Sequence, residues 1–239
     1  MEITSLTNEH IKNVVKLHER KEREISSLFI VEGPHLVKEA EEYGLVKEKY
    51  SLEEKEGYIK VCEQVMRKMC ETNTLVSELA VCKMIEKHEL KDKVLVLDKV
   101  QDPGNLGALM RSAVAFGFET IVLGTGTVDI YNNKVIRSSQ GEIFKLNFIK
   151  EDLVKYIPYL YNNNYQVIGT NVRRGISIND LSINQKFALV LGNEGNGIDE
   201  SVDKVIKENI YLPLKNTESL NVTVAGSIIM YELSNMKGK

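Results

Sequence analysis

The segment DPGNLGALMRSAVAFG at 102–117 places an asparagine and an arginine on one predicted helix, shortly after the apolar run VLVLD at 94–98. A strand, a glycine-bearing turn and a helix in this order often present backbone N–H groups to an anion. Apolar residues recur from Leu106 at helical spacing and predict a buried face. Asn105 is then the expected N-cap, and Arg111 lies about 140° around the helix from Leu106, outside that face. The segment either exposes an amide and a guanidinium for chemistry or is a capped helix with a surface arginine.

A second segment, LGNEGNGIDE at 191–200, follows the apolar run FALV. Its three glycines, Gly192, Gly195 and Gly197, indicate positive φ angles or a close approach by another group. Neither GxGxxG nor GxxxxGK[ST] occurs in the chain, so a dinucleotide site and a P-loop both lack their fingerprint. Glu194 would repel a phosphate, and it suits a cation or hydrogen-bond donors. This charge favours S-adenosyl-L-methionine, which carries a sulfonium and an amino group, over NAD or ATP.

The third segment is IYLPLKNTESLNVTVAGSIIMYEL at 210–233. The pattern predicts a helix over about 219–236, with Ser219 as its N-cap. The helix is apolar nearly all round, which indicates burial on more than one side. The small residues at 225–227 would allow another helix to approach closely, either within the chain or between subunits. Asn221 in its first turn needs a polar partner, although a local cap bond would also satisfy it.

Short apolar runs alternate with helical patterns and form the frame for these segments. VLVLD, TIVLG, QVIGT, FALVLG and NIYLPL are continuous apolar strands, which are typical of a parallel sheet covered on both faces. Before them, a helical pattern over 7–24 and a strand at Leu28–Val31 lead to a helix with Pro34 at N1 and Gly44 at C′. The polar stretch EKHELKDK at 86–93 is the expected linker. We therefore predict a small α/β domain over 1–90 and a second α/β domain over 91–239.

The composition excludes several classes of protein. The 239 residues are 43% hydrophobic and 27% charged, with a net charge of −3, as in soluble globular proteins. No apolar run could span a membrane, and the polar N-terminus does not resemble a signal peptide. Cys62, Cys70 and Cys82 fit neither a disulfide framework nor a zinc site, so we expect a cytoplasmic protein with no metal and no membrane partner. The charge balance means that RNA would bind through local basic patches.

The three segments, in this order, resemble the three signature motifs of the SpoU (TrmH-type) RNA 2′-O-ribose methyltransferases of the SPOUT superfamily. The resemblance covers about 93–236 and includes KVIRSSQGEIFKL, where the family often shows an Arg-x-Ser-x-Gly stretch. SLFIVEGPHLVKEA resembles the small substrate-binding domain of many members. The chain departs from the family at TNTLVSELAVCKM, which lacks the usual Thr-Pro-x-Gly stretch.

The resemblance implies an α/β fold: a SPOUT-type parallel sheet with a C-terminal trefoil knot, preceded by a small α/β substrate-binding domain. The knot is implied by the resemblance alone. The periodicity does not indicate it, and knots are so rare in proteins that a pattern-based prediction would exclude one. The family binds S-adenosylmethionine in the knot and forms homodimers through the first-motif and last helices. Carried over by motif position, the cofactor contacts fall on Gly192, Leu212 and Leu220, with Thr170 and Asn171 nearby.

The resemblance also assigns roles around the methyl-acceptor ribose. Members activate the 2′-hydroxyl with the arginine that corresponds to Arg111. Because a guanidinium does not lose its proton in proteins, we expect Arg111 to polarise the 2′-oxygen while it holds an adjacent phosphate. Asn221 and Ser219 would fix the ribose and the loop. Glu194 would order its loop through hydrogen bonds. Asn105 occupies another of the motif positions that the family uses around this ribose.

The implied function is S-adenosylmethionine-dependent methylation of a ribose 2′-hydroxyl in RNA. Ribosomal RNA is favoured over tRNA, because this N-terminal domain accompanies mostly rRNA-modifying members. A non-catalytic RNA-binding or ribosome-assembly factor on the same fold is the first alternative, and the near-neutral charge balance is its support. A nucleotide-dependent oxidoreductase is the second, and the missing glycine fingerprint disfavours it.

Overall fold

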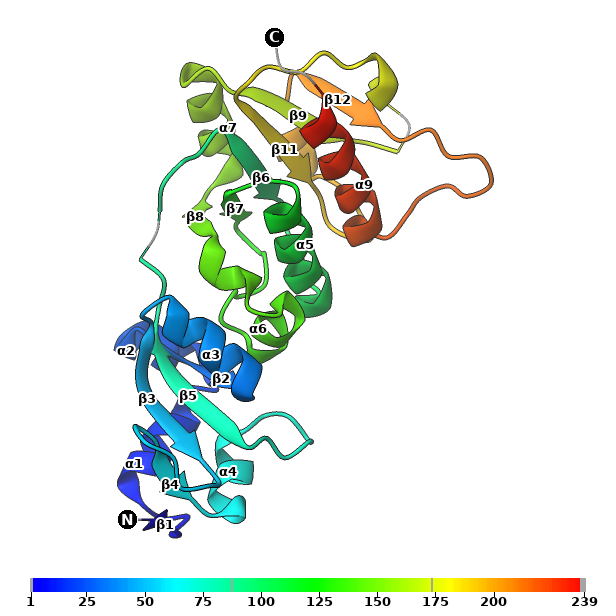
Figure 1. Ribbon diagram of the computed structural model, residues 1–239. Coiled ribbons are helices and arrows are strands. Elements are labelled where there is room, and N and C mark those ends of the chain that lie inside the picture. The colour runs from blue at the N-terminus through cyan, green and yellow to red at the C-terminus, as the bar shows by residue number, and fades with distance from the viewer. Residues whose placement is uncertain (1, 87, 173, 237–239) are drawn as a thin grey trace. The chain divides into compact units, whose positions relative to one another are not determined.

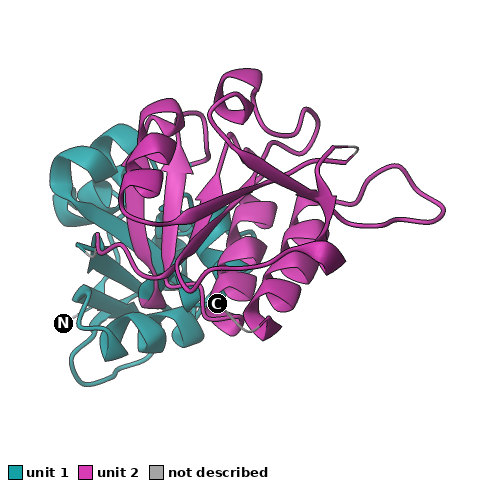
Figure 2. Cartoon of the chain, turned by 90° about the horizontal axis from the view of Figure 1, so that it is seen from above, with its two compact units in different colours: residues 1–86, 129–144 teal, residues 87–128, 145–239 magenta. Residues whose placement is uncertain are grey.

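The computed structural model describes residues 2–86, 88–172 and 174–236, and Lys87 in the predicted linker lies outside them. The chain divides into two compact units (Figures 1 and 2): unit 1 comprises residues 1–86 and 129–144, and unit 2 comprises residues 87–128 and 145–239. Residues 129–144 therefore pack with the first unit, although they lie within the sequence expected to form the second domain.

Unit 1 is a five-stranded mixed sheet with helices packed on it. The strand order is β1-β4-β3-β5-β2, and β5 pairs antiparallel with both β2 and β3. The strands are β1 (Glu2–Ile3), β2 (Leu28–Glu32), β3 (Val46–Ser51), β4 (Ile59–Val61) and β5 (Glu78–Lys83). The helices are α1 (Glu9–Lys16), α2 (Arg20–Ser26), α3 (Pro34–Glu42), α4 (Glu63–Met69) and α6 (Asn133–Ser139).

The helix ends of unit 1 follow the local sequence. Asn8 caps α1 through a hydrogen bond from the backbone N–H of His10 at 2.9 Å. As predicted, α3 begins at Pro34 and Gly44 follows its end with φ 68°. The single helical pattern over 7–24 is instead two helices. The break after α1 is held by Arg23, whose Nη1 donates to the carbonyl oxygens of Leu17 at 2.9 Å and His18 at 2.7 Å.

Buried polar contacts explain why residues 129–144 belong to unit 1. The carboxylate of Glu32, buried at the end of β2, accepts a hydrogen bond from the side-chain amide of Asn133 on α6. Arg23, which is 6% exposed, forms an ion pair of 2.6 Å with Asp129. Since a buried charge is costly without a partner, these contacts fix α6 against β2.

Unit 2 is a seven-stranded, all-parallel sheet with the order β10-β12-β9-β11-β6-β7-β8. The central strands β6, β7 and β11 are almost wholly buried, so the predicted parallel sheet is confirmed. The strands are β6 (Lys93–Leu97), β7 (Thr120–Gly124), β8 (Asn147–Glu151), β9 (Gln166–Thr170), β10 (Ile176–Ser177), β11 (Phe187–Leu191) and β12 (Glu208–Tyr211). The helices are α5 (Pro103–Ala115), α7 (Leu153–Asn162), α8 (Glu200–Asp203) and α9 (Val222–Asn235), with a 3₁₀ turn at Ile178–Asp180. Another 3₁₀ turn, Glu142–Lys145, spans the sequence boundary between the two units. Within the described residues, no helix has the length and apolar character needed to cross a membrane.

Both helices that carry motif residues begin elsewhere than predicted. Asp102, not Asn105, caps α5, and its Oδ1 accepts the backbone N–H of Asn105 at 2.8 Å. Pro103 at N1 explains this start, because its fixed φ suits the first helical position and it has no N–H to satisfy. Asn221, not Ser219, caps α9, and its Oδ1 accepts the backbone N–H of Thr223 at 2.9 Å. The Asn105 side chain is therefore free to bind groups outside its own helix.

The small residues of α9 serve a contact within the chain. A Cβ added at Gly226 would lie 2.6 Å from Leu191 and 2.9 Å from Leu109 on α5. The hydroxyl of Ser227 is 2.7 Å from that of Ser112 on α5. Figure 1 shows the two helices packed side by side. The predicted helix–helix contact therefore forms between α5 and α9 of one chain.

Candidate active site

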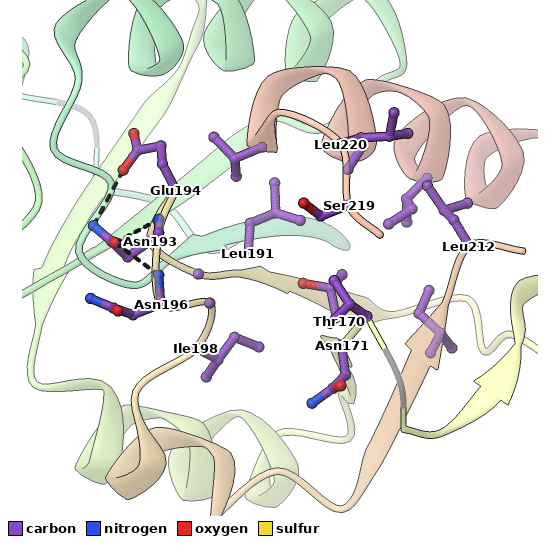
Figure 3. A pocket seen from close by; sticks show the side chains of 18 of the residues that line it. Thr170, Asn171, Leu191, Asn193, Glu194, Asn196, Ile198, Leu212, Ser219 and Leu220 are labelled. Carbon is purple, nitrogen blue, oxygen red and sulfur yellow. Dashed lines mark hydrogen bonds between the residues drawn. The ribbon is translucent and has the colours of Figure 1, made fainter. Parts of the chain in front are cut away.

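The carboxyl ends of three neighbouring strands enclose a pocket. Strands β12, β9 and β11 lie side by side, and the segments that follow them surround a cavity of about 380 Å³ (Figure 3). Ligands of open parallel sheets commonly bind at this edge. The walls combine apolar side chains with polar groups of the loops: Thr170, Asn171, Leu191, Asn193, Ile198, Leu212, Glu218, Leu220, Val222 and Ile229 are among the lining residues.

The structure brings most of the predicted site residues to this pocket. All five residues predicted to contact the cofactor line it: Thr170, Asn171, Gly192, Leu212 and Leu220. Two of the five predicted to act on the ribose, Glu194 and Ser219, line it as well. The other three are Asn105 and Arg111 on α5 and Asn221 at the start of α9.

The loop after β11 is a tight turn stabilised by Asn193. The backbones of Asn193 and Gly197 exchange two hydrogen bonds of 2.9 Å. Asn193 Oδ1 accepts the backbone N–H of Gly195 at 3.0 Å, and its Nδ2 donates to the carbonyl oxygen of Lys99 at 2.9 Å. Asn193 was not among the predicted site residues. An asparagine in a glycine-rich turn could have indicated this role, because its side chain commonly binds the backbone two residues further on.

Gly192 is required where this turn folds back over the end of β11. A Cβ at this position would lie 2.1 Å from the carbonyl carbon of Gly197 and 2.2 Å from the nitrogen of Ile198. Both of these atoms belong to the backbone, so no side-chain rotation could make room. The close approach of one backbone segment to another thus explains this glycine.

Glu194 ties the turn to the start of α5. Its Oε1 accepts hydrogen bonds from Asn105 Nδ2 at 3.0 Å and from the backbone N–H of Asp102 at 3.2 Å. Burial raises the pKa of Glu194, but the hydrogen bonds from Asn105 and nearby backbone N–H groups outweigh burial and leave the pKa below its ordinary value. Glu194 is therefore a carboxylate whose geometry fits the ordering of its loop.

Asn105 joins this carboxylate to the start of α9. Its Oδ1 accepts hydrogen bonds from Asn221 Nδ2 at 3.2 Å and from Thr223 Oγ1 at 3.1 Å. Asn221, Asn105 and Glu194 thus form one continuous chain of hydrogen bonds. This chain connects all three motif segments, which are far apart in the sequence.

A second polar cluster fixes the far end of the loop. The backbone N–H of Asp199 donates to the carboxylate of Asp98 at 2.7 Å, and Lys99 Nζ lies 2.5 Å from Asp199 Oδ2. Burial raises the pKa of Asp98, and the hydrogen bond from Lys99 is the main cause that lowers the pKa of Asp199. These residues, for which the local pattern predicted no role, hold the loop after β11 against the end of β6.

Arg111 lies apart from this network. It is exposed on α5, as the helical spacing predicted, and it does not line the pocket. Arg111 lies six positions after Asn105, which places it about 9 Å further along the helix axis. Within the described ranges, Arg111 makes no ion pair, and no group of three or more His, Cys, Asp or Glu side chains is arranged to hold a metal ion.

Comparison with known families identifies both parts of the chain. The profile of the SpoU rRNA methylase family matches residues 92–231, and that of the MRM3-like substrate binding domain matches residues 8–80. The chain belongs to the SpoU rRNA methylase family. The pocket and all but the last two residues of the motif segments lie in the part matched by the first profile.

Relatives in this family span the whole chain. The 23S rRNA (guanosine(2553)-2′-O)-methyltransferase RlmP of Bacillus subtilis (strain 168) is 38% identical and covers 97% of this chain and 98% of its own. A solved TrmH-family protein from Porphyromonas gingivalis is 28% identical with a TM-score of 0.86, covering 95% of this chain and 98% of its own. An AdoMet-bound rRNA methyltransferase from Sinorhizobium meliloti, 23% identical with a TM-score of 0.86 over 97% of this chain and 96% of its own, shares the fold. The predicted α/β fold of the SPOUT type is confirmed by these likenesses.

Proposed function

We propose that the chain transfers a methyl group from S-adenosylmethionine to a ribose 2′-hydroxyl of 23S rRNA. The observation that carries this proposal is the pocket at the ends of β9, β11 and β12, which all five residues expected to contact the cofactor line. The hydrogen-bond chain from Asn221 through Asn105 to Glu194 places the remaining motif segments beside it.

The pocket fits S-adenosylmethionine in size and chemistry. Its volume of about 380 Å³ lies within the roughly 300–1,000 Å³ of sites for small molecules and cofactors. Leu191, Ile198 and Leu220 offer apolar surface for the adenine, and the loop backbones offer polar groups for its edges. Glu194 and Glu218 add negative charge on the lining, which suits a cofactor with a sulfonium and an amino group. When bound, this cofactor supplies the electrophilic methyl group.

The protein's own residues would position the acceptor ribose. In the reaction the 2′-oxygen forms a bond to the methyl carbon while the bond from carbon to sulfur breaks, and the hydroxyl proton is released. Arg111, exposed on α5, would hold an RNA phosphate and polarise the 2′-oxygen, because a guanidinium binds phosphate in a bidentate manner. Ser219 and the amide of Asn221 would fix the ribose. Alignment of this kind supplies much of the rate of such a transfer.

The whole-chain similarity supports ribosomal RNA as the substrate. The Bacillus relative named for methylation of a guanosine ribose in 23S rRNA covers nearly the full length of both chains. Unit 1 contains the segment that matches a substrate-binding domain. We therefore place the target on a guanosine of 23S rRNA and keep tRNA as the alternative. Such a substrate locates the protein in the cytoplasm with the ribosomes.

An apolar face of α9 supports a homodimer. Val224, Ile228 and Tyr231 are 48%, 40% and 53% exposed and lie on one side of the helix. The ring of Tyr231 packs edge-on against Phe116 at the end of α5, with 5.7 Å between ring centroids. Contiguous exposed apolar residues mark interaction surfaces, and a second copy would bury this face by two-fold symmetry.

The family resemblance also supports a trefoil knot in the segments that follow β11.

A transfer assay tests the proposal. The purified chain is incubated with methyl-labelled S-adenosylmethionine and separately with 23S rRNA, 16S rRNA or tRNA, each lacking its native modifications. Label in 23S rRNA is the expected result, whereas label in tRNA alone would make tRNA the substrate. Binding of RNA without any transfer would instead support the non-catalytic assembly factor.

A further inference from the structure

Thr223 carries a polar contact that the motif roles do not explain. It lies in the first turn of α9, and its side chain is half-buried. Its Oγ1 donates to Asn105 Oδ1 at 3.1 Å and lies 3.4 Å from the carbonyl oxygen of Asn105. A β-branched residue in an apolar helix would ordinarily serve only in packing. Here its hydroxyl connects α9 to the first turn of α5.

The hydroxyl completes the set of hydrogen bonds that hold the Asn105 amide. With Thr223 and Asn221 both donating to Oδ1, the two lone pairs of that oxygen are satisfied. Nδ2 then faces Glu194 Oε1 at 3.0 Å. The amide N–H of Asn221, whose own Oδ1 caps α9, and the carboxylate of Glu194 set which way the Asn105 amide faces. The Thr223 hydroxyl supplies the second hydrogen bond to Oδ1 and so restrains the amide in that orientation.

The Asn105 amide in turn connects two walls of the pocket. Glu194 belongs to the turn after β11, and Asn221 follows directly after Ser219 and Leu220, which line the pocket. Figure 3 shows Glu194 and Ser219 on separate segments beside the pocket. Asn105 is bonded to both segments, so its orientation sets how far apart they are held.

We propose that Thr223 is a positioning residue for the cofactor pocket. Its hydroxyl holds the Asn105 amide in the orientation that links the turn after β11 to the start of α9. Thr223 does not line the pocket itself, so it acts through Asn105. This assignment rests on the proposed use of S-adenosylmethionine. Loss of the hydroxyl would weaken binding of the cofactor and leave binding of RNA unchanged.

Matched variants separate this role from simple packing. Thr223→Val keeps the side-chain shape and removes the hydroxyl, whereas Thr223→Ser keeps the hydroxyl. Ser227→Ala is the control, because the Ser227 hydroxyl contacts Ser112 on α5 at 2.7 Å and the carbonyl oxygen of Thr223 at 2.6 Å, but makes no hydrogen bond to Asn105. Calorimetric titration measures the Kd for S-adenosylmethionine, filter binding measures the Kd for 23S rRNA, and thermal unfolding checks that each variant folds.

We expect Thr223→Val to raise the Kd for S-adenosylmethionine by roughly 3- to 10-fold, the effect of one lost hydrogen bond. The Kd for RNA should stay unchanged, and Thr223→Ser and Ser227→Ala should bind the cofactor like the wild type. In an Asn105→Ala background, Thr223→Val should have no further effect, because the two residues act as one unit.

Three results would overturn the assignment: wild-type cofactor affinity in Thr223→Val, an equal loss in Ser227→Ala, or an additive loss in the Asn105→Ala background. These failures would leave the proposed function intact, provided that the wild type binds S-adenosylmethionine and methylates RNA. A wild-type chain that binds no S-adenosylmethionine would refute both.

Discussion

Gly192→Ala should disable the cofactor pocket through a backbone clash. The added Cβ would lie 2.1 Å from the carbonyl carbon of Gly197, whereas ordinary contacts begin at 3.4 Å. The turn after β11 must therefore retreat by more than an ångström. That movement breaks the two hydrogen bonds of 2.9 Å between Asn193 and Gly197.

The expected magnitude follows from those lost bonds. Two backbone hydrogen bonds are worth about 2 kcal/mol together, and overpacking adds about 1–3 kcal/mol. If these 2 kcal/mol are lost from the free energy of cofactor binding, the affinity for S-adenosylmethionine falls by about 30-fold. The physical cause is a displaced loop, so the change in secondary structure should be small.

Gly195→Ala is the matched control, because it lies in the same turn and a Cβ there has no neighbour nearer than 3.6 Å. Calorimetric titration with S-adenosylmethionine and circular dichroism of both variants check the prediction. Should Gly192→Ala bind the cofactor within twofold of Gly195→Ala, the steric reasoning and the place of this turn in the pocket would both be wrong.

Three further predictions concern the acceptor side, pH and assembly. Arg111→Ala should abolish turnover yet spare the Kd for S-adenosylmethionine, and full activity in the transfer assay would remove Arg111 from the reaction. The folded-state pKa of Glu194 is lowered, so its contribution to stability is present above its unfolded value of 4.5 and is lost as the pH falls through the lower folded value. Urea unfolding of wild type and Glu194→Gln should therefore differ at pH 7 and converge in acid, and a constant difference would contradict this assignment. Tyr231→Asp should convert the proposed dimer to a monomer in analytical ultracentrifugation while Tyr159→Asp on α7 does not; equal sedimentation of both variants would place the interface elsewhere.

The parallel sheet could be predicted because its strands are buried on both faces. The runs VLVL, TIVL and FALVL have no polar alternation, and all of their residues are buried. A continuous apolar run of this kind indicates by its composition alone that the strand is buried on both faces. The pocket residues were carried over from the family resemblance by motif position, and they lie at the carboxyl ends of the neighbouring parallel strands β9, β11 and β12.

The helix starts were mispredicted because two capping residues competed at each site. Asp102 and Asn105 can both cap α5, and Pro103 between them was the deciding signal. Ser219 and Asn221 present the same choice at α9, where Asn221 caps the helix and also binds Asn105. The error mattered, because an Asn105 whose Oδ1 capped α5 could not accept hydrogen bonds from Asn221 and Thr223 through that oxygen.

Contacts between distant residues could not be read from local patterns. Residues 129–144 pack in unit 1 through pairs such as Glu32 with Asn133, which are separated by 101 positions. Thr223 reaches Asn105 across 118 positions. Helical periodicity describes which face of a helix is apolar, but not which distant side chain a half-buried hydroxyl binds.

The most direct test of the central claim identifies the methylated atom. Unmodified 23S rRNA is incubated with the protein and methyl-labelled S-adenosylmethionine, and the RNA is then digested to nucleosides and separated by chromatography. The account predicts label in 2′-O-methylguanosine at one position, marked by a reverse-transcription stop at low nucleotide concentration. Label in a base-methylated nucleoside, or no transfer by a folded protein that binds the cofactor, would contradict it.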